Sequence, residues 1–170
     1  MEGKVVFPDI NVLVKFVLND LDKYKREKTP LRLQKTLYFL FAFYGATYGQ
    51  LRKEKENDKV FEGSENYPKY LFNEDFEAWN YGPVIRKVYT DFKYNPDRIN
   101  QADTWEIDDD EQKKNIYDVL SQVIKQTIEM GDFELIDRTH EDDEWKQAHE
   151  NNQGVMEKDA IIEGYKPNVF

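Results

Sequence analysis

The longest apolar segment of the chain, residues 31–48, has the hydrophobic spacing of a helix. At about 100° per residue, one narrow stripe collects Leu33, Leu37, Leu40, Tyr44 and Tyr48. After Leu37 the polar side disappears, because aromatic residues and Ala42 fill the rest of the circumference. A helix that is apolar all round is normally enclosed by other elements, so we predict that residues 31–48 form a central buried helix.

Both ends of this helix carry recognisable signals. Thr29 is a suitable N-cap and Pro30 suits the first helical position, while Gly49 can end the helix at positive φ. We expect the polar residues of the opening turns to stay partly in contact with water; they are Arg32, Gln34, Lys35 and Thr36. The continuously apolar part is shorter than the ~20 residues that a bilayer requires, so we expect no membrane span.

The segments before and after the central helix are simpler. Residues 5–7 suggest a short strand, and Asp9 can cap a first helix over residues 10–24. Residues 52–68 mix charges with Gly, Ser and Asn and show neither the helical nor the strand hydrophobic period, which indicates a surface excursion. Residues 70–79 are typical of a short hairpin, and a turn at residues 80–83 should let Pro83 open a helix over residues 84–92.

The second half of the chain predicts further helices. We expect a loop over residues 93–110 and then an amphipathic helix over residues 111–130, with acidic residues at its start and Gly131 at its end. Thr139 can cap a short helix that carries Trp145, and residues 155–165 form a last helix. Together these elements predict a single, mainly α domain over residues 1–170, compact around the central helix, with a small β-hairpin.

Composition narrows the function classes. The chain has 170 residues, of which 39% are hydrophobic and 15% aromatic, which is enough for a sizeable core. It has no cysteine, which removes thiol catalysis and thiolate zinc sites, and no signal peptide is visible; both agree with a cytoplasmic location. The net charge of −10 disfavours nucleic acid and favours a basic protein partner.

The candidate chemistry is sparse. His140 lies among acidic residues, so a metal-assisted hydrolase is one alternative, although acids at a helix start are commonly structural. His149 lies nine residues further on, and on one helix the two histidines would point about 180° apart and could not share a metal. We instead predict that Glu77 and His140 form a buried pair between the hairpin and the C-terminal helix. We expect no cofactor, no metal and no catalytic residue.

Three aromatic residues lie in polar, loop-like surroundings: Tyr67, Tyr70 and Trp105. Exposed aromatics beside acidic residues frequently anchor protein interfaces. The alternative is that these side chains fold back onto the core.

Three stretches together resemble one family. They are LRLQKTLYFLFAFYGATYG, LFNEDFEAWNYGPVIRKVYTDF and RTHEDDEW. In this order and spacing they are similar to the signatures of the Panacea domain, the SocA-like or GepA-like phage-associated family. The residues that carry the resemblance are Gln34, Lys35, Tyr38, Glu77, Trp79, Tyr81, Gly82, Pro83, Val84, Thr139, His140 and Trp145. The excursion at residues 52–68 is longer than usual, and Glu144 stands where Pro is common.

The resemblance implies a cytoplasmic antitoxin of a type II toxin–antitoxin system, which binds a cognate protein toxin encoded by an adjacent gene. Some relatives of this kind present their toxin to a protease. The resemblance also implies that the protein is not an enzyme, with the signature residues serving as scaffold or partner contacts. An adaptor or anti-defence protein of a phage or prophage is the main alternative.

Overall fold

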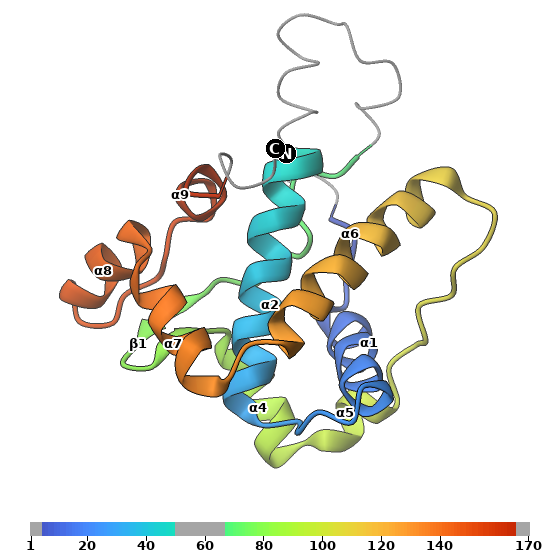
Figure 1. The fold of residues 1–170 in the computed structure, drawn as a ribbon, viewed down its shortest axis with the longest axis horizontal. Helices are drawn as coiled ribbons and strands as arrows, with labels where there is room; N and C mark the ends of the chain where they lie inside the picture. The colour runs from blue at the N-terminus through green and yellow to red at the C-terminus, as the bar shows by residue number, and fades with distance from the viewer. Residues whose placement is uncertain (1–4, 50–66, 166–170) are drawn as a thin grey trace, which may run out of the picture.

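The computed structural model describes residues 5–49 and 67–165. It is mainly α with a small antiparallel hairpin, as the sequence predicts. Figure 1 shows α2 in the centre, with α1 and α6 on one side and α7, α8 and α9 on the other. The bounds of these helices are α1 Ile10–Lys23, α2 Pro30–Tyr44, α6 Glu111–Ile128, α7 Asp132–His140, α8 Asp143–Glu150 and α9 Lys158–Glu163.

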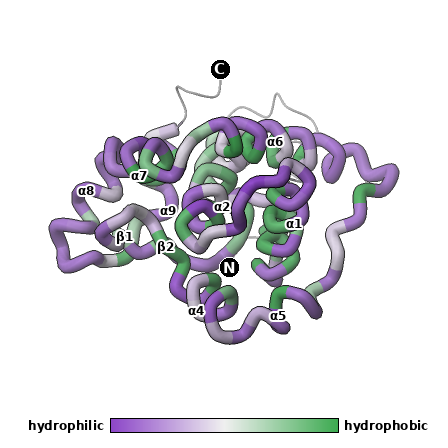
Figure 2. The backbone as a smooth tube through the Cα atoms, turned by 60° about the horizontal axis from the view of Figure 1, so that its bottom comes forward, coloured by the Kyte–Doolittle hydropathy of each residue, from purple (hydrophilic) through white to green (hydrophobic). Residues whose placement is uncertain are grey.

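The remaining elements lie near the N-terminal end of α2. They are β1 (Glu77–Trp79), β2 (Gly82–Val84), α4 (Arg86–Tyr94) and α5 (Pro96–Asn100). Helix α2 contacts β2, α4, α6, α7 and α9 as well as α1. Figure 2 shows α1, α6 and α7 around α2 from a second direction. The prediction of a central helix is therefore confirmed.

The opening turns of α2 differ from the prediction. Arg32, Gln34, Lys35 and Thr36 are all buried rather than partly wet. Periodicity along one helix does not reveal how many neighbours surround it, and here they cover the polar side too. The α-helix ends at Tyr44 and continues as a π-helical segment, η1 (Gly45–Gly49). Gly49 does not have the predicted positive φ; a Cβ there would lie 2.3 Å from the Lys69 carbonyl oxygen, so the glycine permits a close backbone approach.

The predicted helix starts are confirmed by their hydrogen bonds. Thr29 Oγ1 accepts from the Arg32 N–H at 3.1 Å, and Asp9 Oδ1 accepts from the Asn11 N–H at 3.0 Å. At the start of α6, Asp110 Oδ1 accepts from the Lys113 N–H at 3.2 Å. These side chains satisfy N–H groups that have no partner inside the helix.

The hairpin lies further along the chain than predicted. Its strands are β1 and β2, joined at Asn80 and Tyr81, and Pro83 pairs with Ala78 inside β2 instead of opening a helix. Helix α4 consequently starts at Arg86 rather than at residue 84. Pro83 is tolerated because this strand has a free side in the two-stranded sheet, where no ladder N–H is needed. The predicted strand at residues 5–7 is reduced to a single bridge between Val5 and Tyr70.

Three boundaries in the second half are also wrong. The loop predicted over residues 93–110 contains α5, which Pro96 opens. Thr139 is not an N-cap but lies inside α7, where its hydroxyl donates to the Ile136 carbonyl at 2.9 Å. The last helix is shorter than residues 155–165, because Val155 bridges to Glu77 in β1 and α9 begins only at Lys158.

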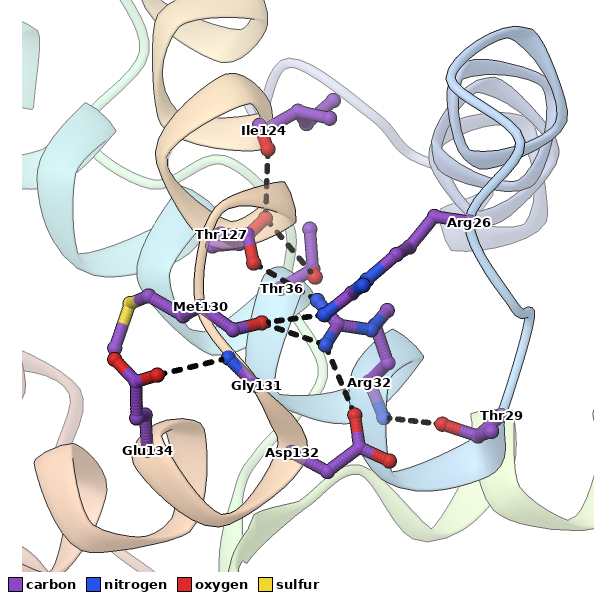
Figure 3. Close-up of polar contacts among 10 residues, drawn as sticks. All are labelled: Arg26, Thr29, Arg32, Thr36, Ile124, Thr127, Met130, Gly131, Asp132 and Glu134. Carbon is purple, nitrogen blue, oxygen red and sulfur yellow. Dashed lines mark hydrogen bonds and ion pairs between the residues drawn. The ribbon is translucent and has the colours of Figure 1, made fainter.

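Arg32 joins α2 to the C-terminal end of α6 (Figure 3). Its guanidinium donates to the Thr127 carbonyl at 2.8 Å, to the Met130 carbonyl at 2.7 Å and to Asp132 Oδ1 at 2.9 Å. Arg26 donates to the same Met130 carbonyl at 2.9 Å. The last carbonyls of a helix have no partner within it. A buried cation here donates to them and interacts favourably with the negative end of the helix dipole.

Within residues 5–49 and 67–165, no helix combines the length and the hydrophobicity needed to cross a membrane.

Candidate protein-binding site

A buried amide of α2 fixes the junction between β2 and α4. The Gln34 side chain accepts from the Ile85 N–H at 2.8 Å and donates to the Ile85 carbonyl at 3.2 Å. Ile85 is the N-cap residue of α4 and cannot provide a side-chain cap of its own. The amide therefore pairs both backbone groups of a residue that is otherwise cut off from water.

Lys35, one turn of α2 from Leu31, lies under the hairpin turn. Its Nζ donates to the Pro83 carbonyl at 3.1 Å, and its side chain is 1% exposed. Burial lowers the pKa of Lys35 to about 7, because the ammonium loses its water. Gly82 is required beside it: its φ is +112°, and a Cβ would lie 2.6 Å from Lys35 Cε and 2.7 Å from Thr139 Oγ1.

Helices α7 and α8 hold the other side of the turn through Trp145. Its indole N–H donates to the Trp79 carbonyl at 3.0 Å. His140 Nε2 lies 3.0 Å from the Asn80 carbonyl oxygen and must carry the hydrogen, because that oxygen only accepts. His149 Nε2 lies 2.9 Å from Asn80 Oδ1, and both imidazoles stack on the Trp145 ring.

Two predictions about the histidines are wrong. His140 and His149 are not on opposite sides of one helix, since they belong to α7 and α8 and meet the same indole. The predicted Glu77–His140 pair does not form either. Glu77 instead accepts from Arg86, at 2.8 and 3.0 Å, and from the Trp79 indole N–H at 3.1 Å. The hydrogen bonds from Arg86 lower the pKa of Glu77.

Tyr38 belongs to a network that sequence reasoning missed. The hydroxyls of Tyr38 and Tyr165 each donate to Asp142 Oδ2 at 2.6 Å, while Arg138 donates to Asp142 Oδ1 at 2.8 Å. Burial, followed by the nearby Tyr165 and Asp142, raises the pKa of Tyr38 well above its usual value. Through these hydrogen bonds Asp142 ties α2 to the C-terminal helices.

A hollow of about 290 Å³ opens between the first turns of α2 and the hairpin turn. Its apolar lining consists of Pro30, Leu31, Trp79, Tyr81, Val84 and Tyr89. Gln34, Lys35, Asn80 and Gln153 supply the polar groups. Tyr81 at its edge is 70% exposed, and the Arg86 guanidinium lies 5.3 Å from the Trp79 ring centroid. The signature residues thus build a rigid turn and the hollow beneath it.

The predicted interface aromatics do not line this hollow, and all three pack against the core. Tyr67 stacks on Tyr48 with ring centroids 4.4 Å apart, and Tyr70 stacks on Phe41. Trp105 meets the rings of Phe7 and Phe16. Their part in an interface stays a prediction. Across residues 5–49 and 67–165, no group of three or more His, Asp or Glu side chains is placed to hold a metal.

A known protein family matches this part of the chain. The family model described as antitoxin SocA-like, Panacea domain, matches residues 61–146. The chain belongs to this Panacea-domain family. The matched Panacea segment includes the hairpin and Trp145, whereas Gln34 and Lys35 of α2 lie before it. In the two other comparisons, no curated protein and no solved structure matched the chain.

Proposed function

We propose that this Panacea-domain protein is the antitoxin of a type II toxin–antitoxin system and neutralises its toxin by direct contact. The observation that carries the proposal is that polar groups of the signature residues make hydrogen bonds within the protein. Gln34, Lys35 and Trp145 each hydrogen-bond the backbone of the hairpin or of the start of α4, while Tyr81 at the tip of the turn is exposed. Such an arrangement suits a displayed binding surface better than a reactive site.

The turn has the properties of an interface anchor. Tyrosine is enriched among the few residues that dominate binding energy. Because both sides of the turn are fixed, little conformational entropy is lost when a partner covers it, and that loss normally weakens binding. A toxin contacting Tyr81 and the adjoining hollow would therefore meet a preorganised surface.

Charge supports a basic partner. The net charge of −10 favours fast encounter with a positively charged toxin through long-range attraction. In this proposal the protein is not an enzyme and acts in the cytoplasm, and the toxin is encoded by an adjacent gene. In this proposal occupancy of the toxin is sufficient for neutralisation, and transfer of the toxin to a protease, which the family resemblance implies for some relatives, is an additional step.

Co-expression with the product of the adjacent gene tests the proposal. We expect that product to stop growth alone and the wild-type protein to relieve the arrest and co-purify with it. Tyr81→Ser should raise the amount of antitoxin needed to neutralise the toxin at least tenfold, because a central aromatic anchor contributes about 2 kcal/mol or more to binding. Phe133→Ser is the matched control, since Phe133 is an aromatic that is 82% exposed on α7.

The outcomes are distinct. Equal neutralisation by Tyr81→Ser and Phe133→Ser would exclude the hairpin turn as the contact surface. If no neighbouring gene product is toxic, or the wild-type protein gives no relief, the antitoxin proposal is wrong. Thermal unfolding of both variants checks that neither substitution changes the fold.

A further inference from the structure

Lys35 is a buried amino group with no counter-charge among residues 5–49 and 67–165. Its single hydrogen bond goes to a backbone carbonyl, and among the described residues no carboxylate contacts it. The ammonium form has three donors, so two of them have no acceptor among the described residues. An amino group that is buried, has no counter-charge and lines an open hollow is a candidate for binding an anionic ligand, which would favour its charged form.

The hollow around Lys35 selects for one kind of ligand. Its described lining contains no acidic residue, and Lys35 is its only charged one. Most of the remaining lining is apolar or aromatic. The volume of about 290 Å³ lies just below the ~300–1,000 Å³ of typical small-molecule pockets, and an apolar cavity of ~150 Å³ already holds a benzene ring. One apolar side chain with an attached carboxylate fits this space and this charge.

We propose that the hollow beside Lys35 receives the C-terminal residue of the partner toxin. The terminal carboxylate pairs with Lys35 Nζ, and the apolar side chain of the same residue packs between Leu31 and Trp79. This inference rests on the proposed function, because it names the part of the toxin that the antitoxin binds.

A C-terminal residue meets both demands of the hollow at once. An aromatic side chain from the middle of a toxin chain would fill the apolar lining but leave the ammonium unpaired. An aspartate or glutamate side chain would pair with the ammonium but would leave the lining of Val84 and Tyr89 uncovered. Charge-assisted hydrogen bonds are about twice as strong as neutral ones, so the carboxylate should dominate selectivity.

The depressed pKa of Lys35 agrees with this geometry. In the free protein desolvation has no opposing charge to offset it. A carboxylate entering the hollow would supply that charge and would favour the ammonium form.

Small probes test the chemistry of the hollow without the toxin. N-acetyl-phenylalanine carries a ring and a carboxylate, and N-acetyl-phenylalanine amide is its uncharged match. We expect the acid to bind wild-type protein at least tenfold more tightly than the amide. Binding is measured by tryptophan fluorescence and is located by the NMR shifts of residues 79–84. Lys35→Met should abolish this preference and keep the fold, whereas Lys114→Met, which removes an exposed lysine of α6, should leave it unchanged.

Each other result overturns part of the inference. Equal binding of acid and amide, or no binding of either, would show that the hollow is not a carboxylate site. If N-acetyl-aspartate amide binds as tightly as N-acetyl-phenylalanine, the apolar side chain has no role and the C-terminal residue is the wrong choice.

Altered forms of the toxin provide a second test. Deleting its last residue, or extending it by two glycines, should weaken binding to the wild-type protein at least tenfold and should change binding to Lys35→Met little. Unchanged binding of the altered toxins would exclude the C-terminal residue as the occupant while leaving neutralisation intact. If the wild-type protein neutralises no neighbouring gene product, the proposed function is wrong. The residue that enters the hollow then does not come from a toxin, whatever the small probes show.

Discussion

At the scale of single residues, the unusual feature is the burial of charged side chains in the central helix. Arg32 and Lys35 are each 1% exposed, yet the two are stabilised differently. Arg32 has several acceptors and a carboxylate, whereas Lys35 has one carbonyl. Lys35 is therefore a position where the fold gives up stability, as binding sites often do.

The pKa of Lys35 predicts how stability depends on pH. It is about 7 in the folded protein and ~10.4 in an unfolded chain. Between these values the unfolded state holds the proton and the folded state does not, so the free energy of unfolding rises with pH. The contribution of this group is complete above the unfolded pKa and is lost as the pH falls through the folded pKa.

We expect the wild-type protein to gain roughly 2 kcal/mol in free energy of unfolding relative to Lys35→Met between pH 7 and pH 9. Urea unfolding of both proteins at several pH values measures this difference. Comparing the two proteins cancels the titration of all other groups. A difference that stays constant with pH would show that Lys35 keeps its proton in the folded state.

At the scale of elements, buried polar groups of α2 decide how its neighbours attach. Gln34 fixes the start of α4, Lys35 and Thr139 surround the hairpin turn, and Arg32 closes the C-terminal end of α6. Apolar packing brings these elements together, but it is not directional. The hydrogen bonds set the position of each end.

Arg32→Met should destabilise the protein by roughly 3 kcal/mol, because the Thr127 and Met130 carbonyls lose a buried donor and Asp132 loses its cation. Urea unfolding measures the change. Lys28→Met is the control, because the Lys28–Asp22 ion pair is exposed and such pairs contribute about 1 kcal/mol or less. Similar losses in both variants would mean that Arg32 is not a specific support of α6.

At the scale of the whole molecule, the acidic charge predicts how binding responds to salt. If the toxin is basic, the association rate should fall roughly tenfold or more between low salt and 0.5 M salt, since screening removes long-range attraction. The dissociation rate should change less, because short-range contacts at the hairpin determine it. Surface plasmon resonance with immobilised toxin measures both rates. An association rate independent of salt would exclude electrostatic steering.

The sequence by itself determined the long helices and many of their starts. A helical hydrophobic period marks α1, α2 and α6, and Asp9, Thr29 and Asp110 cap them through hydrogen bonds that span only two or three residues. The sequence also predicted a turn at residues 80–83, and a turn does lie there, at Asn80 and Tyr81, although it joins the two strands of the hairpin instead of leading into a helix. These features depend on interactions within a few residues, which a linear pattern records.

Only the tertiary structure decided where the polar signature residues point. Pro83 lies in a strand because Ala78 pairs with it, and Thr139 lies inside α7 next to Gly82. His140 and His149 meet on Trp145 although they belong to two helices. Lys35 is buried because the hairpin covers it, and its hollow exists only between segments far apart in the chain. Burial and pairing of this kind depend on which elements become neighbours, and local periodicity contains no such information.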